Sequence, residues 1–229
     1  MTQPRLFGAL VRWDVIRELR RWNSLVPMAL IAFVTLFVFA FAVDPTRIEL
    51  QRSRGGILWA TLLLAASVGV DRAFRGDGDG RLLEALLVAP VNRATLYHAR
   101  VCSTFLFVLA MAAAVVPAFF VLYDQSVGVE GALWIGACAA LALFGFVAVG
   151  VLLSAMTWSV RGGDVLLRVL LFPILLPAFA AAVDLTSRVL DGREADSRAL
   201  LLLLAFDLTF LGAGHLLFEH VVKDLGPQG

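Results

Sequence analysis

Seven charged residues lie in the stretch DRAFRGDGDGRLLEALLVAP, residues 71–90, of a chain in which only 16% of the residues are charged. Three glycines, Gly76, Gly78 and Gly80, interrupt the charges, and the alternating DGDG resembles part of a calcium loop. A calcium loop of the EF-hand type is longer and ends in a glutamate at a fixed spacing, which this stretch lacks. The pattern therefore predicts a polar connection and not a metal site.

The second half of this stretch, RLLEALLVAP, predicts a short amphipathic helix closed by Pro90. Glu84 lies on its polar side. Its apolar side consists of Leu82, Leu83, Leu86 and Leu87. A helix of this kind suits docking into a groove of a soluble partner, and it equally suits a helix that rests on lipid headgroups. Composition alone does not separate these two interpretations.

The sequence motifs of enzyme active sites are absent. There is no GxSxG, HExxH or CxxC, and the only lysine, Lys223, follows two valines instead of a glycine loop that binds phosphate. A non-catalytic chain that does not hydrolyse ATP by itself is therefore predicted, and no motif supports the alternative of an intramembrane enzyme. The histidines are His98, His215 and His220; the last two are five residues apart, on different faces of a helix, so solvated or interfacial histidines are expected.

Asp207 is an acidic residue inside an apolar run. It lies eight residues into the run at about 199–218, which corresponds to a depth of ~12 Å at ~1.5 Å per residue. A charge at that depth costs about 2.5 to 3.5 kcal/mol on insertion scales. The side chain is therefore expected to face protein or water. It could be protonated, hydrogen-bonded to another helix or beside a substrate path, and polar packing between helices is the alternative.

The elements that must position these residues are membrane-spanning helices. The chain has 229 residues, of which 60% are hydrophobic, and its mean hydropathy is +0.87. Solid apolar runs, without the alternation of a β-barrel, approach the ~20 residues that a helix needs to cross a bilayer. The runs are at about 24–43, 55–70, 99–122, 133–156, 165–183 and 199–218. The predicted fold is an all-α polytopic membrane protein with a single transmembrane domain, residues 1–229.

The distribution of basic residues predicts the orientation. Residues 4–22 carry five arginines and a moderate apolar stripe, which predicts an interfacial helix before the first span, although an ordinary basic leader is an alternative. With the N-terminus inside, 13 Lys and Arg residues lie on the inner side and 6 on the outer side. This bias places both termini and residues 71–98 in the cytoplasm. The net charge of +1, without a basic block, gives no reason to expect nucleic-acid binding.

Residues 56–90, GILWATLLLAASVGVDRAFRGDGDGRLLEALLVAP, are similar to the signature region of the CcmB family of ABC-transporter membrane subunits. That region has an acidic residue and Arg, then Phe, a short polar segment, Leu-Glu-x-Leu and a proline. The matching residues are Asp71, Arg72, Phe74, Leu83, Glu84, Leu86 and Pro90. The chain departs from the family pattern at Gly80, because Arg81 and Leu82 stand where one Ser or Thr is usual.

A second stretch, RGGDVLLRVLLFPILLP at 161–177, is similar to the Arg-Gly-Gly, Leu-Leu and proline-rich stretch of the same family. The matching residues are Arg161, Gly162, Gly163, Leu166, Leu167, Pro173 and Pro177. Within this set, Gly162, Gly163, Pro173 and Pro177 are interpreted as a structural hinge. Chain length, six spans and the basic N-terminal helix also fit, so the resemblance covers nearly the whole chain.

The resemblance implies an ABC-2 permease of the type V exporter kind in the bacterial cytoplasmic membrane, active in c-type cytochrome biogenesis. ATP would be hydrolysed by a separate ATPase subunit, no cofactor would be bound directly, and haem is a candidate substrate. The other implied partners are a second copy of the chain, a haem-handling membrane subunit, a small single-span subunit and a haem chaperone. Residues 71–98 would form a cytoplasmic coupling loop that the ATPase engages.

Two rival functions keep the same architecture. One is an ABC-2 permease for a drug, a lipid or a polysaccharide, which the two local motifs disfavour. The other is a passive scaffold that assembles maturation factors without coupling to ATP.

Overall fold

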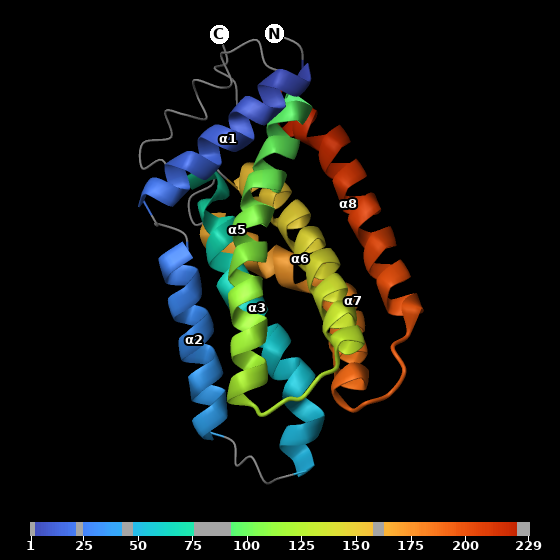
Figure 1. Ribbon diagram of the computed structural model, residues 1–229. Coiled ribbons are helices and arrows are strands. Elements are labelled where there is room, and N and C mark those ends of the chain that lie inside the picture. Colours follow the sequence, from blue (N-terminus) through green and yellow to red (C-terminus); the bar gives the residue numbers. More distant parts are fainter. Residues whose placement is uncertain (1–2, 22–24, 43–47, 76–92, 158–162, 224–229) are drawn as a thin grey trace.

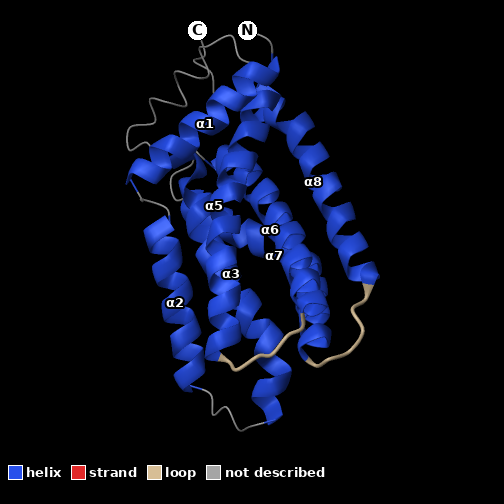
Figure 2. Ribbon diagram, viewed as in Figure 1, coloured by secondary structure: helices blue, strands red, loops and turns tan. Residues whose placement is uncertain are grey.

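The computed structural model describes residues 3–21, 25–42, 48–75, 93–157 and 163–223, and within these ranges all regular structure is α-helical (Figure 2). The helices are α1 (Gln3–Arg21), α2 (Leu25–Ala42), α3 (Ile48–Arg75), α5 (Arg93–Leu122), α6 (Val129–Thr157), α7 (Gly163–Leu190) and α8 (Ser197–Lys223) (Figure 1). The prediction of an all-α membrane protein is confirmed.

Six of the described helices are long and apolar enough to span a membrane. The spans are Leu25–Ala42, Ser53–Asp71, Ala94–Leu122, Val129–Met156, Val169–Leu190 and Ser197–Phe218. Successive spans run in opposite directions (Figure 1). Helix α1 lies across one end of the bundle, which we call the terminal end (Figure 1). Helix α5 begins and helix α8 ends at this terminal end. The connections 123–128 and 191–196 lie at the opposite end (Figure 1).

The predicted coupling loop, residues 71–98, is shorter than expected. Helix α3 continues through residues 71–75, and α5 already begins at Arg93, so both ends of the predicted loop are helical. Each predicted span ends where hydropathy falls, but a helix, whose backbone hydrogen bonds are satisfied internally, can continue into the polar layer. Residues 76–92, which include the predicted amphipathic helix, lie outside the described residues.

Helix α6 is the centre of the bundle. In its most apolar window 72% of the residues are buried, compared with 17% in α2 and in α8, because α3, α5, α7 and α8 all pack against it. Its glycines allow neighbouring helices to approach closely. A Cβ added at Gly150 would lie 2.6 Å from Cγ1 of Val70 on α3, and one added at Gly145 would overlap Asp207 of α8.

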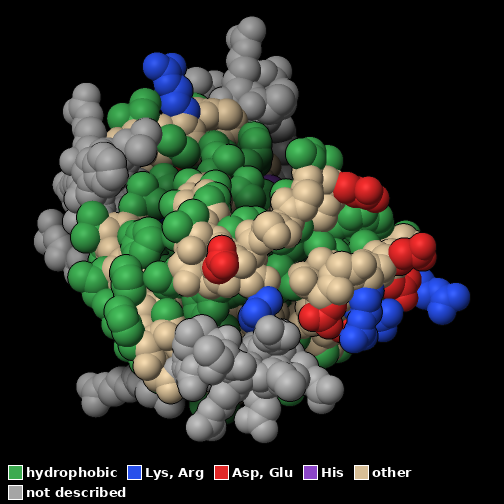
Figure 3. Space-filling model, turned by 60° about the horizontal axis from the view of Figure 1, so that its bottom comes forward, with side chains coloured by type: hydrophobic (Ala, Val, Ile, Leu, Met, Phe, Trp, Pro, Cys, Tyr) green, Lys and Arg blue, Asp and Glu red, His purple; other side chains and the backbone are tan. Residues whose placement is uncertain are grey.

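The outside of the bundle is apolar, as a lipid-facing surface requires. Figure 3 looks towards the opposite end: hydrophobic side chains cover the flanks, and most of the visible charged side chains gather at that end. Exposed apolar residues are frequent on α2 and α8, including Phe41, Leu201 and Leu216. In water such a surface would be unstable, whereas in hydrocarbon it carries no penalty.

Candidate functional site

A buried ion pair at the terminal end joins α1 to the first turns of α5. Nη1 of Arg100 donates hydrogen bonds to both carboxylate oxygens of Asp14, at 3.0 and 3.1 Å, and Oγ of Ser103 donates to Oδ2 at 3.1 Å. Asp14 is only 8% exposed and Arg100 only 7%. Buried charges persist when they are paired and hydrogen-bonded. The ion pair therefore fixes the position of α1 against α5.

The rest of α1 has the features of an interfacial helix. Trp13 is exposed, and the guanidinium of Arg17 lies 4.7 Å from the centre of its ring. Leu10 packs against the core. The apolar stripe of α1 was predicted, but the burial of the acidic residue Asp14 was not. The spacing could have indicated this burial, because Asp14 lies three residues after Val11 and residues three apart share one face of a helix.

Tyr97, one turn before Arg100, holds α5 to α6 and α8. Its side chain is fully buried, and its hydroxyl donates a hydrogen bond to the carbonyl of Ala148 on α6 at 3.1 Å. Its ring centroid lies 5.4 Å from that of Phe218 on α8. The absence of a side chain at Gly214 makes room for this ring, since a Cβ there would overlap the phenol. The start of α5 is thus braced on two further sides.

His98 and His215 form a second link between α5 and α8. Nε2 of His98 lies 3.0 Å from Nδ1 of His215, and the two rings stack at 27° with centroids 5.3 Å apart. One ring therefore donates to the other. The contact was not predicted from the sequence, because no local pattern indicates a partner 117 residues away. The pair is a contact between two helices, and within the described residues no group of three His, Cys, Asp or Glu side chains lies close enough together to hold a metal ion.

The predicted coupling residues fall partly outside the described residues. Asp71 lies half-buried near the end of α3, at the terminal end. Arg72 and Phe74 belong to α3, but their side chains are not described. The remaining residues, Leu83, Glu84, Leu86 and Pro90, all lie in 76–92 and outside the description. The ATPase-coupling role of this set stays a prediction.

The predicted hinge residues also lie partly outside the described residues. Gly162 lies outside the described residues, and Gly163 begins α7. Pro173 and Pro177 lie inside α7, one turn apart, and both are exposed on the outside of the bundle. A proline inside a helix removes one backbone hydrogen bond and crowds the preceding turn, which weakens the helix there. A hinge at these prolines stays a prediction.

Asp207 lies inside the bundle. It is 4% exposed, and Oδ1 faces Gly145 of α6. Within the described part of the chain neither carboxylate oxygen has a hydrogen-bond partner. This burial agrees with the expectation that Asp207 faces protein or water, and a role in a substrate path stays a prediction.

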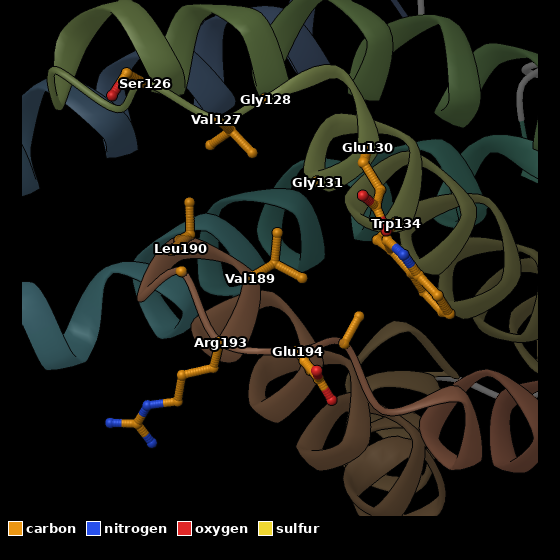
Figure 4. A pocket seen from close by; sticks show the side chains of 12 residues that line it. Ser126, Val127, Gly128, Glu130, Gly131, Trp134, Val189, Leu190, Arg193 and Glu194 are labelled. Atoms are coloured by element: carbon orange, nitrogen blue, oxygen red, sulfur yellow. The ribbon is translucent and has the colours of Figure 1, made fainter.

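The opposite end contains a cavity of about 410 Å³ between the connections 123–128 and 191–196. Val127, Trp134 and Val189 line it, and Arg193 extends away from it (Figure 4). Nearby, Tyr123 donates its hydroxyl hydrogen to the carbonyl of Leu36 at 3.1 Å, and burial raises the pKa of this phenol. No sequence pattern indicates this cavity, because the residues that line it come from two distant connections.

The comparisons with known proteins now identify the family. The model of the family described as CcmB protein matches residues 5–223. This chain belongs to the CcmB family. The protein named Heme exporter protein B of Rhodobacter capsulatus is 24% identical over 159 residues, which are 69% of this chain and 72% of that protein. Its namesake in Bradyrhizobium diazoefficiens is 23% identical over 207 residues, which are 90% of this chain and 92% of that protein.

The resemblance inferred from residues 56–90 and 161–177 is therefore confirmed at the level of the CcmB family. The chain is a multi-pass membrane protein of that family, with six candidate spans in its described part.

Proposed function

We propose that this protein is the membrane subunit of a haem-export system for c-type cytochrome biogenesis. It couples ATP hydrolysis by a separate ATPase subunit either to haem export or to the release of a haem-loaded chaperone. Membership of the CcmB family and the name of its relatives, Heme exporter protein B, support the transport role. The missing phosphate-binding loop supports a separate source of energy.

The bracing of α5 at the terminal end carries the coupling part of this proposal. Helix α5 follows the 76–92 segment directly in the chain. Its first three turns contact α1 through the Asp14–Arg100 ion pair, α6 through Tyr97, and α8 through His98 and His215. A force applied to the segment before α5 is therefore transmitted to three other helices through direct contacts of α5.

The segment 71–90 is the part of the chain that the ATPase engages under this proposal. The leucine face of residues 81–87 docks into a groove of the ATPase, and Glu84 pairs with one of its arginines. Arg72 fixes the base of the segment. Movement of the ATPase pair on binding and hydrolysing ATP then tilts α3 and α5 together.

The same proposal gives the surroundings of the protein. It lies in the bacterial inner membrane with both termini in the cytoplasm. A second copy, a haem-handling membrane subunit, a small single-span subunit and a haem chaperone complete the system. Haem is its candidate substrate and not a resident cofactor, and the chain itself is not catalytic.

Replacement of Glu84 tests the coupling. Glu84→Arg is expected to weaken assembly with the ATPase, or to lower the ATPase rate of the purified complex severalfold, because like charges then meet at the contact. Glu194→Arg makes the same charge change at the opposite end and serves as the matched control. Unchanged assembly together with an unchanged ATPase rate in Glu84→Arg would contradict the coupling role. Normal cytochrome maturation with a hydrolysis-dead ATPase would favour a passive scaffold instead.

A further inference from the structure

Asp207 lies at the middle of its membrane span. The span of α8 is Ser197–Phe218, so Asp207 lies ten residues from one end and eleven from the other. At ~1.5 Å per residue this corresponds to about 15 Å, or half of a hydrocarbon layer ~30 Å thick. A carboxyl group at this depth is far from the water that solvates the helix ends.

Among the described residues, the positively charged side chains of the helices around Asp207 are engaged elsewhere. The helices packed against α8 are α5, α6 and α7. Their titratable and charged side chains at known positions are engaged elsewhere: Arg100 with Asp14, Tyr97 with Ala148, His98 with His215, Cys138 with Ala182, and Arg188 with Asp184. Cys102 of α5 and Glu130 of α6 carry no positive charge at neutral pH. Within the described residues, neither oxygen of Asp207 accepts or donates a hydrogen bond.

Helix α6 nevertheless has a place for this carboxyl group. The methyl group of an alanine at position 145 would overlap Oδ1 of Asp207. The ring of Phe206 borders the same space, since a Cβ at Gly145 would lie 2.9 Å from its Cδ1. Phe206 in turn contacts Phe210, with ring centroids 4.5 Å apart. Gly145 thus provides a cradle for a polar group in otherwise apolar surroundings.

We propose that Asp207 is a proton-binding site at the centre of the membrane. Its carboxyl group is held as the neutral acid for as long as α6 and α8 stay packed, because an anion without a partner in an apolar interior is far costlier than a protonated acid. The proton is released only when α8 moves away from Gly145 and the group meets water or a cation. Proton release and separation of these two helices are therefore linked.

Infrared difference spectroscopy tests the site directly. The full-length protein in lipid vesicles at neutral pH is compared with Asp207→Asn. The difference spectrum is expected to contain the C=O stretching band of a neutral carboxylic acid, lost in the variant. A spectrum that shows only the loss of carboxylate bands would overturn the proposal. Both samples are first checked for the same helical content.

A hydrophobic carbodiimide tests the cradle. The reagent takes up the acidic proton on one nitrogen while the carboxyl oxygen adds to its central carbon, and the product rearranges to a stable N-acylurea without any further reactant. Gly145→Ala is expected to push the carboxyl group out of its contact with α6 and to raise labelling of Asp207 severalfold, as located by mass spectrometry. Gly136→Ala, where an added Cβ meets nothing within 4 Å, is the matched control in the same helix.

Equal labelling of Asp207 in the two glycine variants would overturn the role of Gly145. Efficient labelling of the wild-type residue by a water-soluble carbodiimide would overturn the burial of the neutral acid. Neither experiment requires the ATPase or haem, so their outcomes are independent of the proposed function.

Discussion

At the scale of single residues, the buried carboxylate of Asp14 is a position where substitution is expected to lower the stability of the protein. Its carboxylate neutralises Arg100 and accepts from Ser103 in a place where both charges are nearly out of contact with solvent. The net value of such a pair is small, because both charges lost their hydration when they were buried. Removal of one partner is costly nonetheless, because the other keeps its charge in an apolar place.

Asp14→Asn is therefore expected to destabilise the protein by about 3–5 kcal/mol. Thermal unfolding of the purified protein in detergent measures the effect. Asp184→Asn, which breaks the exposed ion pair between Asp184 and Arg188, is the control and is expected to have little effect. Equal stability of Asp14→Asn and the wild type would contradict the structural role of the ion pair.

At the scale of helices, the contact between α5 and α8 depends on the absence of a side chain at one position. Gly214 faces the ring of Tyr97, which is fixed in turn by its hydrogen bond to α6. A fully buried ring bonded on its far side has little freedom to move away. An added methyl group must therefore push α8 away from α5.

Gly214→Ala is expected to destabilise the protein by about 1–3 kcal/mol, the usual cost of overpacking. Gly212→Ala provides the control in the same helix, because nothing lies within 4 Å of its added Cβ. The control is expected to be neutral or slightly stabilising, since alanine favours a helix more than glycine does. The unfolding midpoints of both variants measure these effects on stability. A loss of stability in Gly212→Ala alone would contradict the packing described.

The helices themselves were largely predictable from the sequence, whereas the contacts between them were not. Six apolar runs, the interfacial α1 and the small residues of α6 follow from composition and spacing that are visible within one helix. The partners of Asp14 and His98 lie 86 and 117 residues away, and no local pattern indicates them. The ends of α3 and α5 were also missed, because hydropathy reports where lipid ends and not where a helix ends.

For the whole molecule, one prediction concerns its orientation in the membrane. The bias of basic residues places the terminal end in the cytoplasm. Alkaline phosphatase is active only when it is exported. A fusion after Gly80 is therefore expected to be inactive and a fusion after Glu194 active. The reverse pattern would overturn the orientation and, with it, the proposed place of the ATPase.

The central position of α6 also bears on biosynthesis. This helix is the fourth of the six spans to leave the ribosome, and it packs against α7 and α8, which follow it. The first span, α2, has few buried side chains, so it can stay in lipid before the other helices are made with little loss of packing. A nascent chain arrested before α8 would leave the Gly145 face of α6 uncovered, so the bundle assembles fully only after translation of its last span.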